Sequence, residues 1–344
     1  MGIGETAGLA SAAIWSISSL LYSYARMTAW ELNYWKNVFT TFIFLVHLWI
    51  VRNYFEPGPL FEAPLEAWCW LGLSSVVGIV VGDTVYLRSL QILGARRALV
   101  VATASPIFGV LIGFFFMQDL ISVLLVAGVG LTVFGVGIVV GDKKAEVENP
   151  NVYPGKFMIG VSLGVGAALC QASGVAFAKL GMAHGCEALE SSFIRIFTAA
   201  VAMTWMVVMY PERYAVSEKP VVKPQGKPGT EATEDEEKVA TGPDSLSTEA
   251  PQTVRASILK PLTEWYSMKF FIPGVLMGTW IGIWFFQMAQ QYTDTAVVTT
   301  LVSTCPIFAI PLVWLVQGHR VSLQGILGTG IAVLGIYLVV SQSS

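Results

Sequence analysis

Several ionisable side chains lie inside long apolar stretches of this chain, among them Lys36, Asp83 and Arg195. A charged group is costly in the hydrocarbon core of a bilayer, so such residues are functional candidates wherever a stretch crosses a membrane. The carboxylate of Asp83 could exchange a proton, bind a cation or contact a substrate amine. The alternative is structural, with Asp83 as the partner of a basic residue on a neighbouring span, Arg88 included.

The two basic residues occupy matching places, because each lies five positions after a glutamate, Lys36 after Glu31 and Arg195 after Glu190. Either could belong to a gating or coupling ion pair or contact an anionic substrate. The alternative is that the long side chain extends to the membrane surface and keeps its charge in water. Local pairing with the preceding glutamate is also open, although a spacing of five is poor on a straight helix.

Amides and prolines suggest where a small molecule could bind. Gln171 and Gln287 carry amides that are expensive to leave unpaired in lipid. Pro106 and Pro306 each remove a helix hydrogen bond in mid-stretch, and the freed carbonyl must then face protein or a wet cavity. The alternatives are a packing kink for the prolines and membrane-surface anchoring for the tryptophans. The candidate substrate-binding set is Trp15, Asp83, Tyr86, Thr103, Ser105, Pro106, Gln171, Trp280, Trp284, Gln287, Ser303 and Pro306.

Several kinds of chemistry lack their sequence signatures. The four cysteines are isolated, and no HExxH or GxxxxGK[ST] pattern occurs. The sequence Gly160-Val161-Ser162-Leu163-Gly164 matches GxSxG, but it falls inside an apolar run and not at the strand-to-helix turn that this motif needs. We therefore expect no catalytic residue, no cofactor and no bound metal. The net charge is −3 and no basic block occurs, so nucleic acid is not an expected partner.

The composition indicates the elements that must position these residues. The chain is 54% apolar and 12% charged, whereas a soluble domain carries about 25% charged residues. Apolar runs recur at the length that a helix needs to cross a bilayer. We predict an all-α membrane protein. Its ten spans are expected at roughly 4–25, 33–52, 67–90, 96–117, 121–141, 156–180, 189–210, 270–291, 296–317 and 322–341.

One segment has a different composition. Residues 211–267 are rich in Lys, Glu, Pro, Thr and Ser and poor in aromatic residues, so they cannot bury enough apolar surface to fold alone. We predict a disordered charged loop between the seventh and eighth spans. A regulatory or partner-binding role for this loop is the alternative.

An internal duplication is visible when the sequence is shifted by 200 positions. The segments 78–140 and 278–340 then share 13 identities across 63 positions without a gap, where composition alone gives roughly half that number. A weaker match aligns Glu31 and Lys36 with Glu190 and Arg195. The glycines of the last span in each copy are expected to form close-packing faces. They are Gly128, Gly130, Gly135, Gly137, Gly325, Gly328, Gly330 and Gly335.

The duplication has a topological consequence. A unit of five spans begins and ends on opposite sides of the membrane, so its second copy must be inverted. Inverted repeats place a shared site near the middle of the membrane, and rocking of the halves exposes that site to each side in turn. The expected units are 1–142 for the first repeat and 143–210 with 268–344 for the second.

These features resemble a known family. Ten spans, the five-plus-five duplication and the sequence Ser105-Pro106-Ile107-Phe108 followed by Asp119 are similar to EamA-type members of the drug/metabolite transporter superfamily. That family usually has glutamate where this chain has Asp119, and the second copy has His319 there. The motifs are specific for the fold and weak for the substrate.

The resemblance and the inverted topology imply a multi-pass protein, expected in the plasma membrane. Its expected activity is secondary transport, in the export direction, of a small-molecule substrate by alternating access, with proton coupling as one option. Its other partner is the lipid bilayer. The alternatives are a non-transporting receptor or scaffold, supported by the loop at 211–267, and a membrane-embedded enzyme.

Overall fold

The computed structural model describes residues 2–117, 122–140, 156–209, 265–317 and 322–341. Asp119, His319 and most of the charged loop, 211–264, lie outside the described residues. Every regular element in the described ranges is a helix. Five helical stretches are long and apolar enough to cross a membrane: Ala29–Phe55, Leu65–Leu93, Phe157–Met182, Ala188–Met209 and Trp265–Tyr292.

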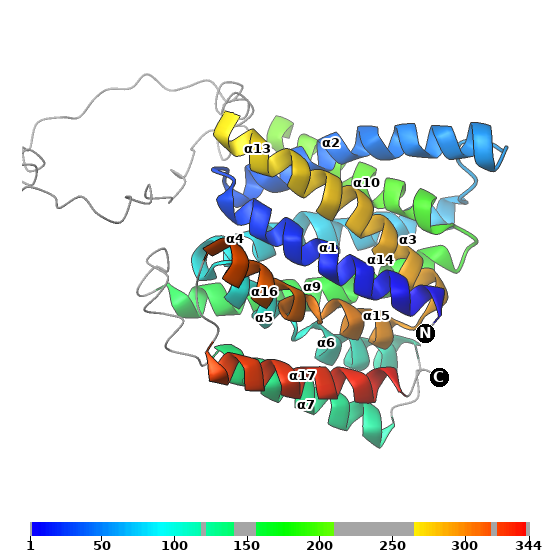
Figure 1. Cartoon of the computed structure of the whole chain (residues 1–344). Helices are drawn as coiled ribbons and strands as arrows, with labels where there is room; N and C mark the ends of the chain where they lie inside the picture. The colour runs from blue at the N-terminus through cyan, green and yellow to red at the C-terminus, as the bar shows by residue number, and fades with distance from the viewer. Residues whose placement is uncertain (1, 118–121, 141–155, 210–264, 318–321, 342–344) are drawn as a thin grey trace, which may run out of the picture.

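The helices lie side by side along one direction, and the start of the first helix and the end of the last helix lie at the same end of the bundle (Figure 1). We call that end the termini end. The first-half elements are α1 (Ile3–Tyr24), α2 (Ala29–Ile50), η1 (Val51–Phe55), α3 (Leu65–Ser75), η2 (Val76–Asp83), α4 (Thr84–Leu93), α5 (Ala95–Ala102), α6 (Ser105–Ile112), η3 (Gly113–Met117) and α7 (Val123–Val140). The later elements are α9 (Phe157–Met182), α10 (Ala188–Met209), α13 (Trp265–Gly274), η4 (Val275–Ile281), α14 (Gly282–Tyr292), α15 (Thr295–Val302), α16 (Cys305–Gln317) and α17 (Leu323–Val340).

Two of the expected spans are each divided into two helices. The stretch 96–117 is interrupted between α5 and α6, and the stretch 296–317 between α15 and α16. The expected loss of a helix hydrogen bond in mid-span is therefore wrong for Pro106. The break precedes the proline, and Pro106 falls in the first turn of α6, where a missing N–H leaves no hydrogen bond unmade.

The segments η2 and η4 are π-helical, and η4 packs closely against α1. Three glycine carbonyls along α13, η4 and α14 accept hydrogen bonds from α1 side chains: Ser18 to Gly274 at 3.0 Å, Trp15 to Gly278 at 2.9 Å and Ser11 to Gly282 at 3.1 Å. A side chain at Gly278 would meet the Ser18 Cβ at 2.5 Å. Glycine is therefore what allows α1 to approach this backbone and bond to it.

The helices α7 and α17 form a closely packed pair at one edge of the bundle (Figure 1). A Cβ on Gly135 would meet the Ala332 nitrogen at 2.5 Å, and a Cβ on Gly335 would meet the Thr132 nitrogen at 2.5 Å. Residue numbers rise along one helix as they fall along the other, so the pair is antiparallel. The expected close-packing role does not extend to Gly130, Gly137 and Gly330, because nothing lies within 4 Å of a Cβ there.

Candidate functional site

A cavity of about 140 Å³ lies inside the bundle, with walls from elements of both halves of the chain. On α1, its lining residues fall between Trp15 and Tyr22, in the half of that helix away from the termini end. The sequence-predicted residues that line it are Trp15, Lys36, Asp83, Tyr86, Thr103, Ser105, Gln171, Arg195 and Ser303.

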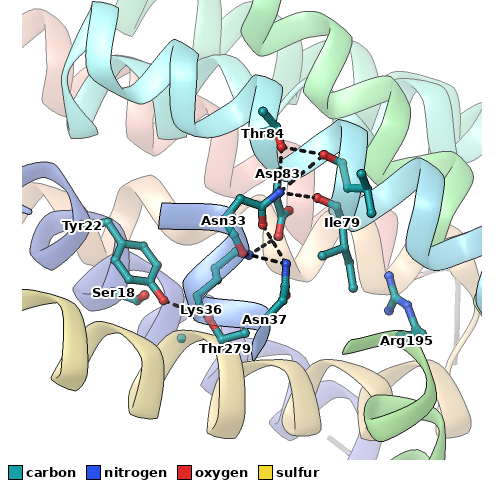
Figure 2. A network of polar contacts seen from close by, with 12 residues as sticks. Ser18, Tyr22, Asn33, Lys36, Asn37, Ile79, Asp83, Thr84, Arg195 and Thr279 are labelled. Carbon is teal, nitrogen blue, oxygen red and sulfur yellow. Dashed lines mark hydrogen bonds and ion pairs between the residues drawn. The ribbon is translucent and has the colours of Figure 1, made fainter. Parts of the chain in front are cut away.

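Lys36 and Asp83 form an ion pair at one wall of this cavity (Figure 2). The Lys36 side chain is 7% exposed and the Asp83 side chain is 34% exposed. The expected basic partner on a neighbouring span is therefore present, whereas the suggestion of Arg88 and the membrane-surface position of Lys36 need correction. Asp83 pairs with Lys36 and not with Arg88, which bonds Gln91 on its own helix at 3.4 Å. Lys36 turns inward instead of reaching for the membrane surface.

Asn33 joins α2 to the π-helical segment that ends at Asp83. Its Nδ2 donates to the Ile79 carbonyl at 2.9 Å and to the Thr84 Oγ1 at 2.7 Å (Figure 2). The neighbouring Asn37 donates to the Asn33 Oδ1 at 3.0 Å. These buried amides hold η2 against α2, and so they fix the position from which Asp83 meets Lys36. Sequence reasoning missed Asn33, although a buried amide in an apolar span was the available signal.

Arg195 also turns inward and is 5% exposed. Its Nη1 donates to the Gln287 Oε1 at 2.6 Å. Gln287 is fixed in turn, because its Oε1 also accepts from Gln290 at 2.6 Å and its Nε2 donates to Ser191. Gln287 does not line the cavity and instead lies behind Arg195, where it orients the guanidinium.

The two glutamates do not pair with the basic residues five positions later. Glu31 accepts from the Thr28 backbone nitrogen at 2.8 Å and so caps its own helix. Glu190 accepts from the backbone nitrogens of Glu62 and Ala63, both at 2.9 Å. A spacing of five directs the paired side chains to different faces of the helix, which explains why both local pairs are absent.

Hydroxyl groups from four elements line the rest of the cavity. Tyr22 and Thr279 share a hydrogen bond of 2.9 Å, and Ser19 and Tyr86 share one of 3.0 Å. Across the breaks, the hydroxyls of Ser105 and Ser303 are 3.5 Å apart. The lining residues that sequence reasoning missed include Ser18, Ser19, Tyr22, Thr279, Phe286 and Cys305.

Three other predicted residues are not among those that line the cavity. Trp280 and Trp284 face α2, where their ring centroids lie 5.7 and 4.8 Å from that of His47. The physical reason is helix phase, because Thr279 and Ile283, one residue earlier in each case, take the cavity-facing positions. Pro106 begins α6 without lining the cavity. The Pro306 side chain lies outside what the structure describes.

At the termini end, ionic contacts join the helix ends. Arg52 lies 3.6 Å from Glu62 and 3.7 Å from Glu187, and the Lys179 Nζ lies 2.7 Å from the Asp294 Oδ1. These contacts link the ends of η1, α9 and α14 and the loops beside them. We call these ion pairs the bonded layer, and its carboxylates lie at the surface of the termini end.

Cys186 lies in the loop beside this layer and is buried. Burial, with the carboxylates of Glu190 and Glu187, raises the pKa of its thiol to about 12, and Arg52 opposes this in part. In the described ranges, no cluster of His, Cys, Asp and Glu could hold a metal ion.

Long apolar helices and buried charges around an internal cavity define an integral multi-pass membrane protein. The model of the EamA-like transporter family matches residues 2–141 and 251–341. The chain belongs to this family, which confirms the resemblance seen in the sequence and makes the protein a member of a family of membrane transporters.

Structural comparison supports the same fold. One solved structure, described only as the crystal structure of a protein, is similar over 99% of this chain and 97% of its own, with a TM-score of 0.62 and 12% sequence identity. At that identity the likeness concerns the fold alone. Comparison with curated protein sequences gives no significant match.

Proposed function

We propose that this protein is a secondary transporter that exports a small metabolite across the plasma membrane by alternating access, with the cavity as its binding site. The observation that carries the proposal is the cavity itself. It combines an ion pair, a buried guanidinium and several hydroxyls inside a bundle of apolar helices. Such groups are costly in a membrane unless they bind something polar.

The proposed architecture is ten spans in two inverted five-span repeats, 1–142 and 143–344 without the loop at 211–267. The antiparallel packing of α7 and α17 supports it, since these are the last spans of the two copies. The divided spans support it too. A Cβ on Gly109 of α6 would meet the Thr299 Oγ1 of α15 at 2.7 Å, and Ser105 faces Ser303. Residue numbers rise along one of these segments as they fall along the other, so the two segments also pack antiparallel.

The direct test is transport by the purified protein in sealed vesicles. Vesicles preloaded with one unlabelled compound should accumulate the same labelled compound by counterflow, which needs no driving ion. The panel would cover amino acids, short organic acids, sugars and nucleosides. Counterflow of at least one compound is expected. If none is exchanged by folded protein across the panel, a receptor or scaffold role replaces the transporter.

The bonded layer at the termini end makes a second prediction, on Cys186. With the other three cysteines replaced by alanine, maleimide labelling of Cys186 should be roughly a thousandfold slower at pH 7 than that of an ordinary thiol, because only the thiolate reacts. The raised pKa means that the structure with Cys186 buried holds the thiol proton more tightly, so rising pH favours conformations in which this thiol is exposed. We expect the labelling rate to keep climbing past pH 9, and labelling against pH measures it.

The control for this experiment is the same protein unfolded in detergent, where the rate should level off near the ordinary thiol pKa. A folded protein whose labelling also levels off there would have an exposed Cys186. The loop that holds Cys186 would then expose this thiol, contrary to its burial in the structure.

A further inference from the structure

The charges that line the cavity do not cancel. Among the described lining residues, Lys36 and Arg195 are basic and Asp83 is acidic. Lys36 and Asp83 neutralise each other in their ion pair. Arg195 is charged at neutral pH. The cavity therefore carries one positive charge in excess.

The surroundings of Arg195 compensate that charge only in part, through the longer-range attraction of Asp83. No carboxylate lies within ion-pair distance of its guanidinium in the described ranges. Its side-chain contact is the neutral amide of Gln287, and its buried Nε has no hydrogen-bond partner. A buried cation with unused donors is expensive unless an anion reaches it. The side chain lines the cavity, so a ligand in the cavity can supply that anion.

The size and walls of the cavity limit the rest of the ligand. A cavity of about 150 Å³ engineered in another protein holds benzene, and this one measures about 140 Å³. Trp15 and Phe286, with ring centroids 4.9 Å apart, supply apolar wall next to the hydroxyls. A compact ligand with a small carbon skeleton and one anionic group fits these walls.

We propose that the cavity binds small carboxylates, and that Arg195 is the residue that binds the carboxylate group. A guanidinium presents its N–H groups in a planar fork that matches the two oxygens of a carboxylate. Gln287 acts as a positioning residue that aims the fork. This inference rests on the proposed function and names its substrate class.

Matched pairs of a carboxylate and its amide test the proposed ligand class whatever the carbon skeleton of the natural ligand. They are L-lactate with L-lactamide, L-valine with L-valinamide, and benzoate with benzamide. The purified full-length protein is titrated with each, and binding is followed by isothermal calorimetry. In at least one pair the carboxylate should bind about 10- to 100-fold more tightly than its amide, the range for charge-assisted hydrogen bonds.

The decisive variant is Gln287→Glu, which has the same shape and places a carboxylate beside Arg195. Gln290 can still donate to it, and the Ser191 hydroxyl can turn to donate. This variant should melt at the same or a higher temperature than the wild type and lose the preference for carboxylates. Arg195→Gln should lose it as well. Lys269→Gln removes an exposed cation outside the cavity and should bind the probes as the wild type does.

Three outcomes would overturn the proposal. They are equal binding of carboxylates and amides, full carboxylate binding by Gln287→Glu, and binding of no carboxylate up to roughly 10 mM, ten times the usual upper KM. The result is separable from the transport assay. Carboxylate binding without counterflow would contradict the proposed transport and support the carboxylate site. Counterflow of uncharged compounds alone would support the proposed transport and contradict the carboxylate site.

Discussion

Replacing Asp83 by asparagine is expected to abolish uptake driven by a pH gradient while substrate exchange at equal pH continues. Asparagine keeps the shape of the side chain and its hydrogen bonding, but it cannot take up or release a proton. Asp83 is the acidic residue among the described cavity-lining positions, and its side chain is one-third exposed to that space. It can therefore meet both a proton and a substrate.

The measurement compares the two modes of transport in the same vesicles. Uptake is recorded with an imposed pH gradient, and counterflow without one. Glu66→Gln serves as the matched control, because it makes the same chemical change at an exposed position on α3. A pH-driven uptake that survives Asp83→Asn unchanged would remove Asp83 from the coupling mechanism.

The same variant should also be less stable. A second substitution distinguishes this loss of stability from a loss of proton coupling. Asparagine leaves the buried Lys36 ammonium without its counter-ion, and breaking a buried pair costs about 3 kcal/mol or more. Solvent in the cavity reduces this, because Asp83 is partly exposed. Adding Lys36→Met to Asp83→Asn should raise the melting temperature again. If Asp83 couples protons, the double variant should be stable and still lack pH-driven uptake.

The sequence identified the charged residues of the cavity but not their partners. Lys36, Asp83 and Arg195 could be selected because a charge stands out against an apolar span. Which charges meet depends on how far each helix is rotated about its axis, and hydropathy does not specify that rotation. The sequence could therefore predict only that Asp83 has some basic partner, Arg88 included, whereas the structure pairs it with Lys36.

Helix rotation also explains why the sequence predicted some of the aromatic residues of the cavity wrongly and missed several of its hydroxyl residues. Trp280 and Trp284 were selected for their side-chain chemistry, yet the positions just before them, Thr279 and Ile283, face the cavity. Ser18, Ser19 and Tyr22 of α1 were missed because uncharged hydroxyl side chains are common in apolar helices and do not stand out as a charge does. The π-helical turns of η2 and η4 change the phase along the span, which a regular helical period could not have predicted.

The second large effect, on stability, is expected at Gly135 and Gly335, where α7 packs against α17. A Cβ on Gly135 would meet the backbone nitrogen of Ala332 and the backbone oxygen of Gly328, both at 2.5 Å. Neither atom can move without shifting α17. Gly135→Ala should therefore separate the two helices and destabilise the protein by about 1–3 kcal/mol, the usual range for overpacking. Thermal unfolding in detergent measures the effect.

Gly137→Ala is the matched control, since it lies on the same helix with nothing within 4 Å of the new Cβ. It should be neutral or stabilising, because alanine favours a helix by roughly 0.8–1 kcal/mol over glycine. Equal losses for Gly135→Ala and Gly137→Ala would show that glycine itself, and not the close approach, is what matters.

The second copy extends this prediction to the proposed inverted repeat. Gly335 meets the backbone nitrogen of Thr132 and the oxygen of Gly128, both at 2.5 Å, so its surroundings match those of Gly135 with the two helices exchanged. Gly335→Ala should therefore destabilise the protein as much as Gly135→Ala does. The double variant should lose less than the sum, because one separation of the helices relieves both clashes. Unequal single losses, or losses that add fully, would contradict a two-fold relation between α7 and α17.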